Sequence, residues 1–279
     1  MSNRTTENLF KTNAIRVAPA DTPFWYTSGK FGPFYINTHF LIKDEGVAND
    51  VLRIIEDECA ADKDKAPKII FEVLDRQYNS SETYRDVIEE LVEVASRYDF
   101  DFISGGERRD FFFSMLVAHL MDKPHLAIYK DLSTTYTDSD FNPLNVPITG
   151  KTGLHIADLI TEASSYERAW VPAIRDVSAS INNTIAVVDR HQNGAAVLRG
   201  LGITMETLTG VDKALFDEAL SKGYIDNAQY DLVIKFLENP DKYMKDFVAS
   251  HPTFIEDQIK LGGKNAERAK LALEKGFVS

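Results

Sequence analysis

The sequence predicts an α/β fold, with a mainly parallel twisted sheet flanked by helices and an α-helical C-terminal extension. Short apolar, β-branched runs at 100–104, 126–129, 153–159 and 183–188 alternate with helical patterns at 111–121, 164–177 and 193–201. Strands that alternate with helices are joined by crossovers, which favour parallel pairing. After about residue 211 the strand-like runs end, and Gly and Pro breaks separate expected helices at 212–222, 226–238, 240–250 and 264–275. We therefore divide the chain into an α/β domain, 1–210, and a helical extension, 211–279.

The segments before residue 100 and the long polar stretch after residue 131 complete the expected organisation. A helix and connector are expected at 8–26, a turn followed by a strand at 27–42, and helices at 46–59 and 81–97, whereas 68–78 fits either helix or strand. The acidic residues at 86–93 are expected on a solvated helix face. Residues 132–149, rich in Ser, Thr, Asp, Asn and Pro, are expected to form a long loop.

Composition narrows the class of protein. The 279 residues include 43 Asp and Glu against 31 Lys and Arg, a net charge of -12, which disfavours nucleic-acid binding but not a small phosphorylated ligand in a local basic pocket. A single cysteine, Cys59, favours a reducing compartment, and the six histidines show no metal-ligand spacing. We see no signal peptide at 1–11 and no membrane-spanning run, so the expectation is a cytoplasmic protein without a membrane partner.

Two segments that follow expected strands carry groups suited to phosphate and sugar. In a parallel sheet, ligands bind at the carboxyl ends of strands. Gly105 and Gly106 precede Arg108 and Arg109 at the start of a helix, where backbone amides and guanidinium groups attract phosphate. The alternative is that the glycines only make the turn, while Glu107 and Asp110 cap the helix or pair with the arginines.

The second segment runs from Asp158 to Ser165. Its Asp would accept hydrogen bonds from sugar hydroxyls, and the hydroxyl-rich turn that opens the next helix would hold a phosphate. A strand followed by a Ser or Thr helix cap is the alternative. Lys30 among aromatic residues suits a planar anion, with a turn into a buried strand as its alternative. The turn at 189–194 is expected to be structural, with an Asp–Arg pair.

Taken together and in this order, these segments resemble orotate phosphoribosyltransferases over about residues 20–210. Ser28 to Lys30 with Phe34 to Asn37 is similar to the orotate-binding segment of that family, and Ser104 to Asp110 to its pyrophosphate-binding strand, loop and helix. Lys123 to Asp131 resembles the strand that enters the mobile catalytic loop. Ala157 to Ser165 resembles the signature for phosphoribosyl diphosphate (PRPP), and Asp189 to Gly202 also matches.

The resemblance implies a type I phosphoribosyltransferase fold, a homodimer, and Mg²⁺ bound with PRPP. The implied reaction joins orotate N1 to ribose C1 with loss of pyrophosphate. Asp158 and Lys130 are the implied catalytic residues: Asp158 holds the ribose hydroxyls, and Lys130 faces pyrophosphate with Arg108. The implied contacts to the base are Lys30, Phe34, Tyr35 and, as a substitute for a family Arg, Arg168. Those to the 5′-phosphate are Thr161, Ala163, Ser164 and Ser165.

Four departures from the family pattern keep other functions open. Ala157 stands where the family has the first of two adjacent acids, and Glu162 lies inside a turn that is small and Gly-rich in the family. Residues 132–149 contain no Lys, Arg or His, whereas the family's catalytic loop carries a Lys and a His-Gly. The segment 45–100 is longer than usual. One alternative is therefore a non-catalytic relative that binds a nucleotide or nucleobase and regulates; another is a phosphoribosyltransferase for a different base.

Overall fold

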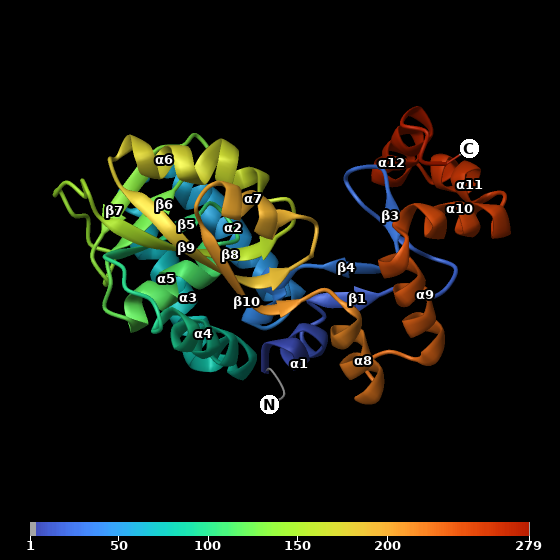
Figure 1. Ribbon diagram of the computed structural model, residues 1–279, viewed down its shortest axis with the longest axis horizontal. Coiled ribbons are helices and arrows are strands. Elements are labelled where there is room, and N and C mark those ends of the chain that lie inside the picture. Colours follow the sequence, from blue (N-terminus) through green and yellow to red (C-terminus); the bar gives the residue numbers. More distant parts are fainter. Residues whose placement is uncertain (1–3, 279) are drawn as a thin grey trace. The chain divides into compact units, whose positions relative to one another are not determined.

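A computed structural model describes residues 4–278 and divides the chain into two compact units, which are treated separately here (Figure 1). Unit 1 comprises residues up to 14 and 37–211, and unit 2 comprises 15–36 and the residues from 212 onward. The expected boundary at 210–211 therefore lies beside the last crossing between the units. Residues 15–36, however, group with the C-terminal helices and not with the α/β domain in which the sequence division placed them.

Unit 1 is built on a six-stranded sheet in the order β10-β9-β8-β5-β6-β7. The strands are β5 (Phe102–Gly106), β6 (His125–Ile128), β7 (Thr134–Thr137), β8 (Thr152–Ile160), β9 (Ser180–Asp189) and β10 (Thr204–Gly210). All neighbours pair in parallel except β7, which is antiparallel to β6. The mainly parallel sheet expected from strand–helix alternation is confirmed.

The two edge strands were not expected. β7 lies inside the stretch 132–149 that was interpreted as loop, and β10 covers residues with no strand expected. An edge strand has one neighbour and an exposed side, so it does not need the continuous apolar run of a central strand. β10 is polar, TMETLTG, and none of its side chains is fully buried.

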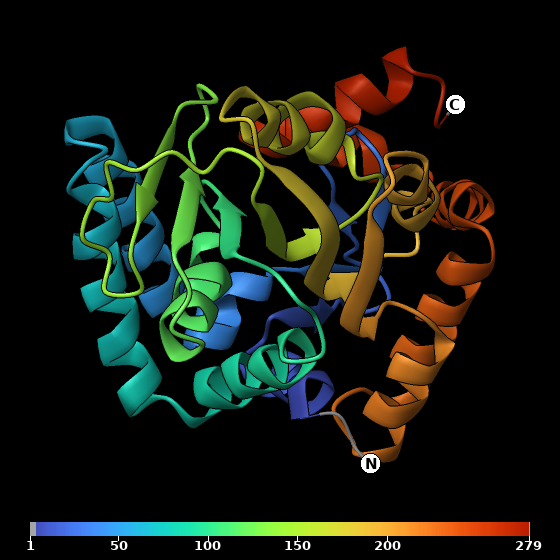
Figure 2. The ribbon, with the colours of Figure 1, turned by 60° about the vertical axis from the view of Figure 1, so that its left-hand side comes forward.

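Helices cover both faces of this sheet. The helical segments of unit 1 are α1 (Arg4–Lys11), the 3₁₀ segment η1 (Thr38–Ile42), α2 (Glu45–Ala61), α3 (Ala66–Ser80), α4 (Glu82–Ala95), α5 (Phe111–Leu120), the π-helical turn η2 (Tyr166–Trp170), α6 (Val171–Asp176) and α7 (Gly194–Gly200). Helices α4 and α5 lie on one face, with α6 and α7 on the other (Figures 1 and 2). Residues 68–78 are thus helical, and 38–42 form η1 instead of a strand.

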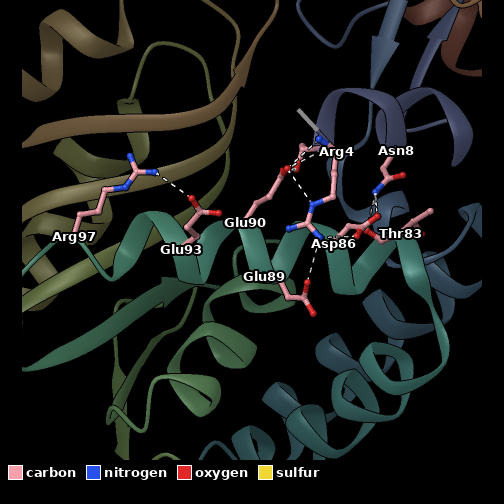
Figure 3. Close-up of polar contacts among 9 residues, drawn as sticks. Arg4, Asn8, Thr83, Asp86, Glu89, Glu90, Glu93 and Arg97 are labelled. Atoms are coloured by element: carbon pink, nitrogen blue, oxygen red, sulfur yellow. Dashed lines mark hydrogen bonds and ion pairs between the residues drawn. The ribbon is translucent and has the colours of Figure 1, made fainter. Parts of the chain in front are cut away.

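The acidic face of α4 is not fully solvated, because α1 packs on it. The guanidinium of Arg4 pairs with Asp86 at 2.9 Å and with Glu89 at 3.2 Å (Figure 3). The Glu90 carboxylate accepts a hydrogen bond of 2.9 Å from the backbone N–H of Arg4, and Asn8 donates to Asp86 at 3.1 Å. Part of the acidic run that was expected to face solvent therefore binds the N-terminal helix to α4.

Unit 2 combines four short strands with five helices. The strands are β1 (Ile15–Val17), β2 (Phe24–Trp25), β3 (Phe31–Gly32) and β4 (Phe34–Ile36), and the helices are α8 (Lys213–Ser221), α9 (Asn227–Glu238), α10 (Pro240–Ser250), α11 (Phe254–Leu261) and α12 (Gly263–Glu274). Its core is aromatic: Trp25 stacks on Phe254 with centroids 5.7 Å apart, and Phe31 packs edge-on against Phe247 at 5.4 Å. Helix α11 was not expected from the sequence. Across the described part of both units, every helix is too short or too polar to cross a lipid bilayer.

Candidate active site

A cavity of about 400 Å³ opens at the carboxyl ends of β5, β6 and β8, within unit 1. This is the edge of a parallel sheet at which ligands are expected. Three turns line it, one after each strand, together with Tyr166 and Trp170 from η2. Seven of the residues predicted to bind PRPP line this cavity: Arg108, Lys130, Asp158, Thr161, Ala163, Ser164 and Ser165. The fold therefore brings these seven predicted residues together around one cavity.

Asp158, near the end of β8, is held from two sides. Its Oδ2 accepts a hydrogen bond of 2.8 Å from the hydroxyl of Thr38 in η1, and its backbone N–H donates to Asp110 Oδ1 at 2.9 Å. Burial, followed by the nearby charge of Asp110, raises the pKa of Asp158 to about 7, although Arg109 and the Thr38 hydroxyl act in the opposite direction. The carboxyl group is thus fixed in orientation and changes charge near neutral pH.

The turn after β8 presents polar groups that the protein itself leaves unused. Within residues 4–278, the hydroxyls of Thr161, Ser164 and Ser165 have no hydrogen-bond partner, and a helical stretch begins at Ser164. Ala163 adopts φ 55°, the left-handed conformation that forms the turn. Glu162 is exposed and is not among the described residues that line the cavity. The carboxylate that departs from the family pattern therefore faces solvent.

Cations gather at the turn after β5, but most are already paired. Arg108 forms an ion pair with Glu56 of α2. Lys130, after β6, lies 3.3 Å from a Glu107 oxygen and 3.6 Å from the same Glu56. The Glu107–Arg108 peptide is cis. In the described chain, Arg109 lines the cavity without an ion pair, so it is the uncommitted positive charge of the site.

Asp110 neither caps α5 nor pairs with an arginine, the two alternatives weighed from the sequence. No side-chain cap is formed at α5; instead the Asp110 carboxylate accepts hydrogen bonds from the backbone N–H groups of Gly106, at 3.0 Å, and Asp158, at 2.9 Å. Gly106 is required for packing, since a Cβ there would lie 2.2 Å from the Trp170 ring. The end of β5 is thereby fixed between a carboxylate and an indole.

The turn after β6 is short and closed. The N–H of Tyr129 donates to the Ser133 carbonyl at 2.9 Å, and Asp131 forms an ion pair with Lys63. β7 then runs back along β6, with Thr137 opposite His125. Asp138 and Asp140 consequently lie beyond the amino end of β6, at the opposite sheet edge from the cavity, and not over a pyrophosphate site.

Four predicted site residues lie elsewhere. Lys30, Phe34 and Tyr35 belong to unit 2, where Phe34 is 2 % exposed and packs against Phe216 and Phe236, and Lys30 pairs with Asp241 at 2.8 Å. Arg168, in η2, donates through Nε to the Ser164 carbonyl at 3.3 Å and is not among the described cavity-lining residues. Their proposed contacts to a base stay predictions.

Four participants were missed, because only the tertiary fold brings η1, α2 and η2 to the cavity: Thr38, Glu56, Tyr166 and Trp170. The turn at 189–194 was expected to be structural. Asp189 receives a hydrogen bond of 2.8 Å from the His191 backbone N–H, and the His191 ring lies 2.9 Å from its other oxygen, so the turn after β9 has an Asp–His contact.

Comparison with known proteins establishes the fold. No sequence-family profile and no curated protein sequence matches the chain. Among solved structures, Leishmania donovani UMP synthase aligns with a TM-score of 0.61 and 18% identity, covering 85% of this chain and 42% of that one. Francisella tularensis orotate phosphoribosyltransferase aligns at 0.52 and 13% identity, covering 83% and 96%.

The chain has the type I phosphoribosyltransferase fold. It spans less than half of the length of the UMP synthase. Identities of 18% and 13% establish a shared fold only, because one fold carries many activities. The resemblance to orotate phosphoribosyltransferases that the sequence shows is therefore confirmed for the fold.

Proposed function

We propose that this protein transfers the phosphoribosyl group of PRPP to orotate or a related nucleobase in pyrimidine nucleotide biosynthesis, giving a nucleoside monophosphate and pyrophosphate. The observation that carries the proposal is the set of polar groups in the cavity that can still form hydrogen bonds or ion pairs with a ligand. Hydroxyls of the turn after β8, the carboxyl group of Asp158 and the free guanidinium of Arg109 face one space of about 400 Å³. This combination suits a phosphate, a sugar and a second anionic group in one ligand.

The placement of the donor follows from these groups. The 5′-phosphate would bind Thr161, Ala163, Ser164 and Ser165 at the start of a helix, where amides and the helix dipole favour an anion. The ribose hydroxyls would bind Asp158. The diphosphate would then extend toward the cations of the other two turns, Arg109 first, with Arg108 and Lys130 released in part from Glu56.

The reaction breaks the bond between ribose C1 and the diphosphate oxygen, which leaves with the electron pair, and forms a bond from C1 to orotate N1, which loses its proton. Positive charge develops on the ribose ring between these events. The negative charge of ionised Asp158 stabilises it, and the cations stabilise the departing pyrophosphate. Lys130 and Asp158 are the two residues to which we assign catalytic roles.

Mg²⁺ would enter this site already bound to the phosphates of the substrate. In the described part of the chain, no cluster of three or more His, Cys, Asp or Glu is able to hold a metal. Mg²⁺ commonly binds through substrate phosphates without a complete protein cage. When bound, it would neutralise charge on the diphosphate oxygens.

Acceptor recognition is assigned to four further residues. We assign contacts to the base to Lys30, Phe34, Tyr35 and Arg168, on the family resemblance alone. Lys30 would have to exchange its ion pair with Asp241, which is exposed and therefore weak. The same resemblance supports a homodimer that works in the cytoplasm.

The closed turn after β6 favours a second candidate, a non-catalytic relative that binds a nucleotide or nucleobase and regulates. Residues 132–149 carry no cation, and Asp131 ties the turn to Lys63. A chain with this arrangement would retain the phosphate and ribose contacts but lack a mobile cationic loop to cover pyrophosphate.

One assay separates these candidates. Orotate loss and pyrophosphate release are followed together with orotate, PRPP and Mg²⁺, and calorimetry measures PRPP binding. We expect turnover that requires all three and falls at least about 100-fold in Asp158→Asn. Asp138→Asn, whose carboxylate also accepts backbone hydrogen bonds but lies at the opposite sheet edge, is the matched control. PRPP binding without turnover on any pyrimidine or purine base favours the regulatory candidate. No PRPP binding rejects phosphoribosyl transfer, and the regulatory candidate is rejected as well if nucleotides and nucleobases also fail to bind.

A further inference from the structure

Asp110 stands beside Asp158 although it comes from a different strand–helix connection. Asp110 is 7 % exposed, lines the cavity, and receives one backbone N–H on each carboxylate oxygen. An ionised carboxylate has about four acceptor positions, so two remain after these bonds. Asp110 is thus fixed in place yet still able to accept two hydrogen bonds from a ligand.

The histidine behind Asp110 does not donate a hydrogen bond to it, so donors for its two remaining acceptor positions would come from the cavity. Behind it, His155 bonds through Nδ1 to Ser104 Oγ at 2.9 Å. His155 Nε2 is buried and lacks a hydrogen-bond partner among residues 4–278, and it lies 3.6 Å from Asp110 Oδ2, which is too long for a hydrogen bond. The imidazole therefore fills the space behind the carboxylate without satisfying it.

On β8 itself, the position before Asp158 offers no such group. Ala157 is 2 % exposed and belongs to the hydrophobic cluster around Tyr166 and Ile174. Ala157 also lines the cavity, but its methyl group offers a ligand no hydrogen-bond acceptor. Asp110 brings a carboxylate to the same end of β8 from the neighbouring strand, through the hydrogen bond to the Asp158 N–H.

We propose that Asp110 is the second ribose-binding carboxylate of this protein, accepting one of the two vicinal hydroxyl groups while Asp158 accepts the other. This inference rests on the proposed function, because it requires a phosphoribosyl ligand in the cavity. In this arrangement, Asp110 in the turn after β5 replaces a second acid that would otherwise stand next to Asp158 on β8. Each carboxylate then binds one ribose hydroxyl group. The paired acceptors would select a sugar with both hydroxyl groups.

The test is a thermodynamic cycle with three probes: ribose 5-phosphate, 2-deoxyribose 5-phosphate and 3-deoxyribose 5-phosphate. Calorimetry measures their Kd values for the wild type, Asp110→Asn and the control Asp138→Asn. A hydrogen bond to a charged acceptor is worth enough for about a 10- to 100-fold change in affinity. We expect Asp110→Asn to weaken the binding of ribose 5-phosphate by this factor. The variant should leave unchanged the affinity for the deoxy sugar that lacks the hydroxyl group bound by Asp110.

Each outcome of the cycle has a separate meaning. Equal weakening of all three sugars, or no weakening, overturns the assignment of Asp110 and leaves the proposed function standing. Failure of the wild type to bind either ribose 5-phosphate or PRPP overturns the proposed function, and the inference with it.

Should Asp110→Asn fail to fold, the wild type still gives a decision. The ¹³C resonance of the Asp110 carboxyl carbon is expected to shift with ribose 5-phosphate and not with inorganic phosphate. A resonance that is unmoved by ribose 5-phosphate overturns the proposal.

Discussion

Two turns at the same edge of the sheet differ in how their polar groups are used. After β8, the hydroxyls of Thr161, Ser164 and Ser165 have no partner within residues 4–278 and line the cavity. After β6, Asp131 is bound to Lys63, and the Ser133 carbonyl to Tyr129. Buried or half-buried polar groups normally find partners within the protein. The difference supports our proposal that the first turn binds a ligand, whereas the polar groups of the second turn bind one another and Lys63.

Removing the free cation between these turns should have the largest effect. Arg109→Ala deletes a charge that has no ion pair in the described chain, although it lowers the pKa of Asp158, so the loss falls mainly on a bound anion. We expect about 100-fold weaker binding of inorganic pyrophosphate, measured by calorimetry. Arg175→Ala, an exposed arginine of α6, is the control and should change nothing. Equal losses in both variants would mean that only net charge matters.

The two turns should also contribute to stability with opposite dependence on pH. The pKa of Asp158 is raised from 3.8 to about 7, so the folded state holds this proton more tightly, and stability falls as pH rises between these values. Each unit of difference in pKa corresponds to about 1.4 kcal/mol. The Lys63 and Ser133 contacts lower the pKa of Asp131, so its contribution is instead lost toward acidic pH.

Denaturant unfolding between pH 2 and 8 checks both signs, because the contribution of Asp131 is lost only below its ordinary pKa of 3.8. Relative to the wild type, Asp158→Asn should gain stability as pH rises through this range. Asp131→Asn should lose stability relative to the wild type at the upper end and approach it in acid. Parallel curves for the wild type and Asp158→Asn would contradict the assignment of Asp158.

The hydroxyls of the first turn can be removed together. Since the hydroxyls of Ser164 and Ser165 have no hydrogen-bond partner among the described residues, Ser164→Ala with Ser165→Ala should leave the thermal midpoint unchanged. Two charge-assisted hydrogen bonds to a phosphate are worth at least about a 10-fold change in affinity. We therefore expect ribose 5-phosphate to bind about 10-fold more weakly by calorimetry. A lower midpoint with unchanged affinity would assign the hydroxyls to the fold.

The smallest effect on binding is expected from Lys63→Ala, which opens the second turn. Lys63 binds Asp131 and, at 2.9 Å, the Ser133 hydroxyl. Its loss should speed amide hydrogen exchange at 130–133 and change ribose 5-phosphate affinity less than about two-fold. Lys65→Ala, which removes only a pair with nearby Asp62, is the matched control. A large change in affinity would show that this turn also contacts the ligand.

The sequence predicted the centre of the fold better than its margins. Apolar runs marked β5, β6, β8 and β9, whereas β7 and β10, the two edges, lack such runs because one side of each is exposed. In the site, spacing placed Asp158 and the Ser164 turn together, since both follow one strand. The sequence analysis named Asp110 but did not predict its hydrogen bond with the Asp158 N–H, because hydrogen bonds between strand ends depend on the packed sheet. No local sequence pattern indicates that residues 15–36 pack with α8 to α12.

Unit 2 is discontinuous, and this has a consequence for how the chain folds during synthesis. Residues 15–36 are synthesised well before their packing partners, which begin at residue 212. Phe31, almost fully buried against Phe247 and Phe254, has no core to enter until those residues emerge. Synthesis at about 5–20 residues per second leaves this aromatic segment uncovered for roughly ten seconds or more. During that interval it is a natural target for chaperones, and shortening the C-terminus would make its exposure permanent.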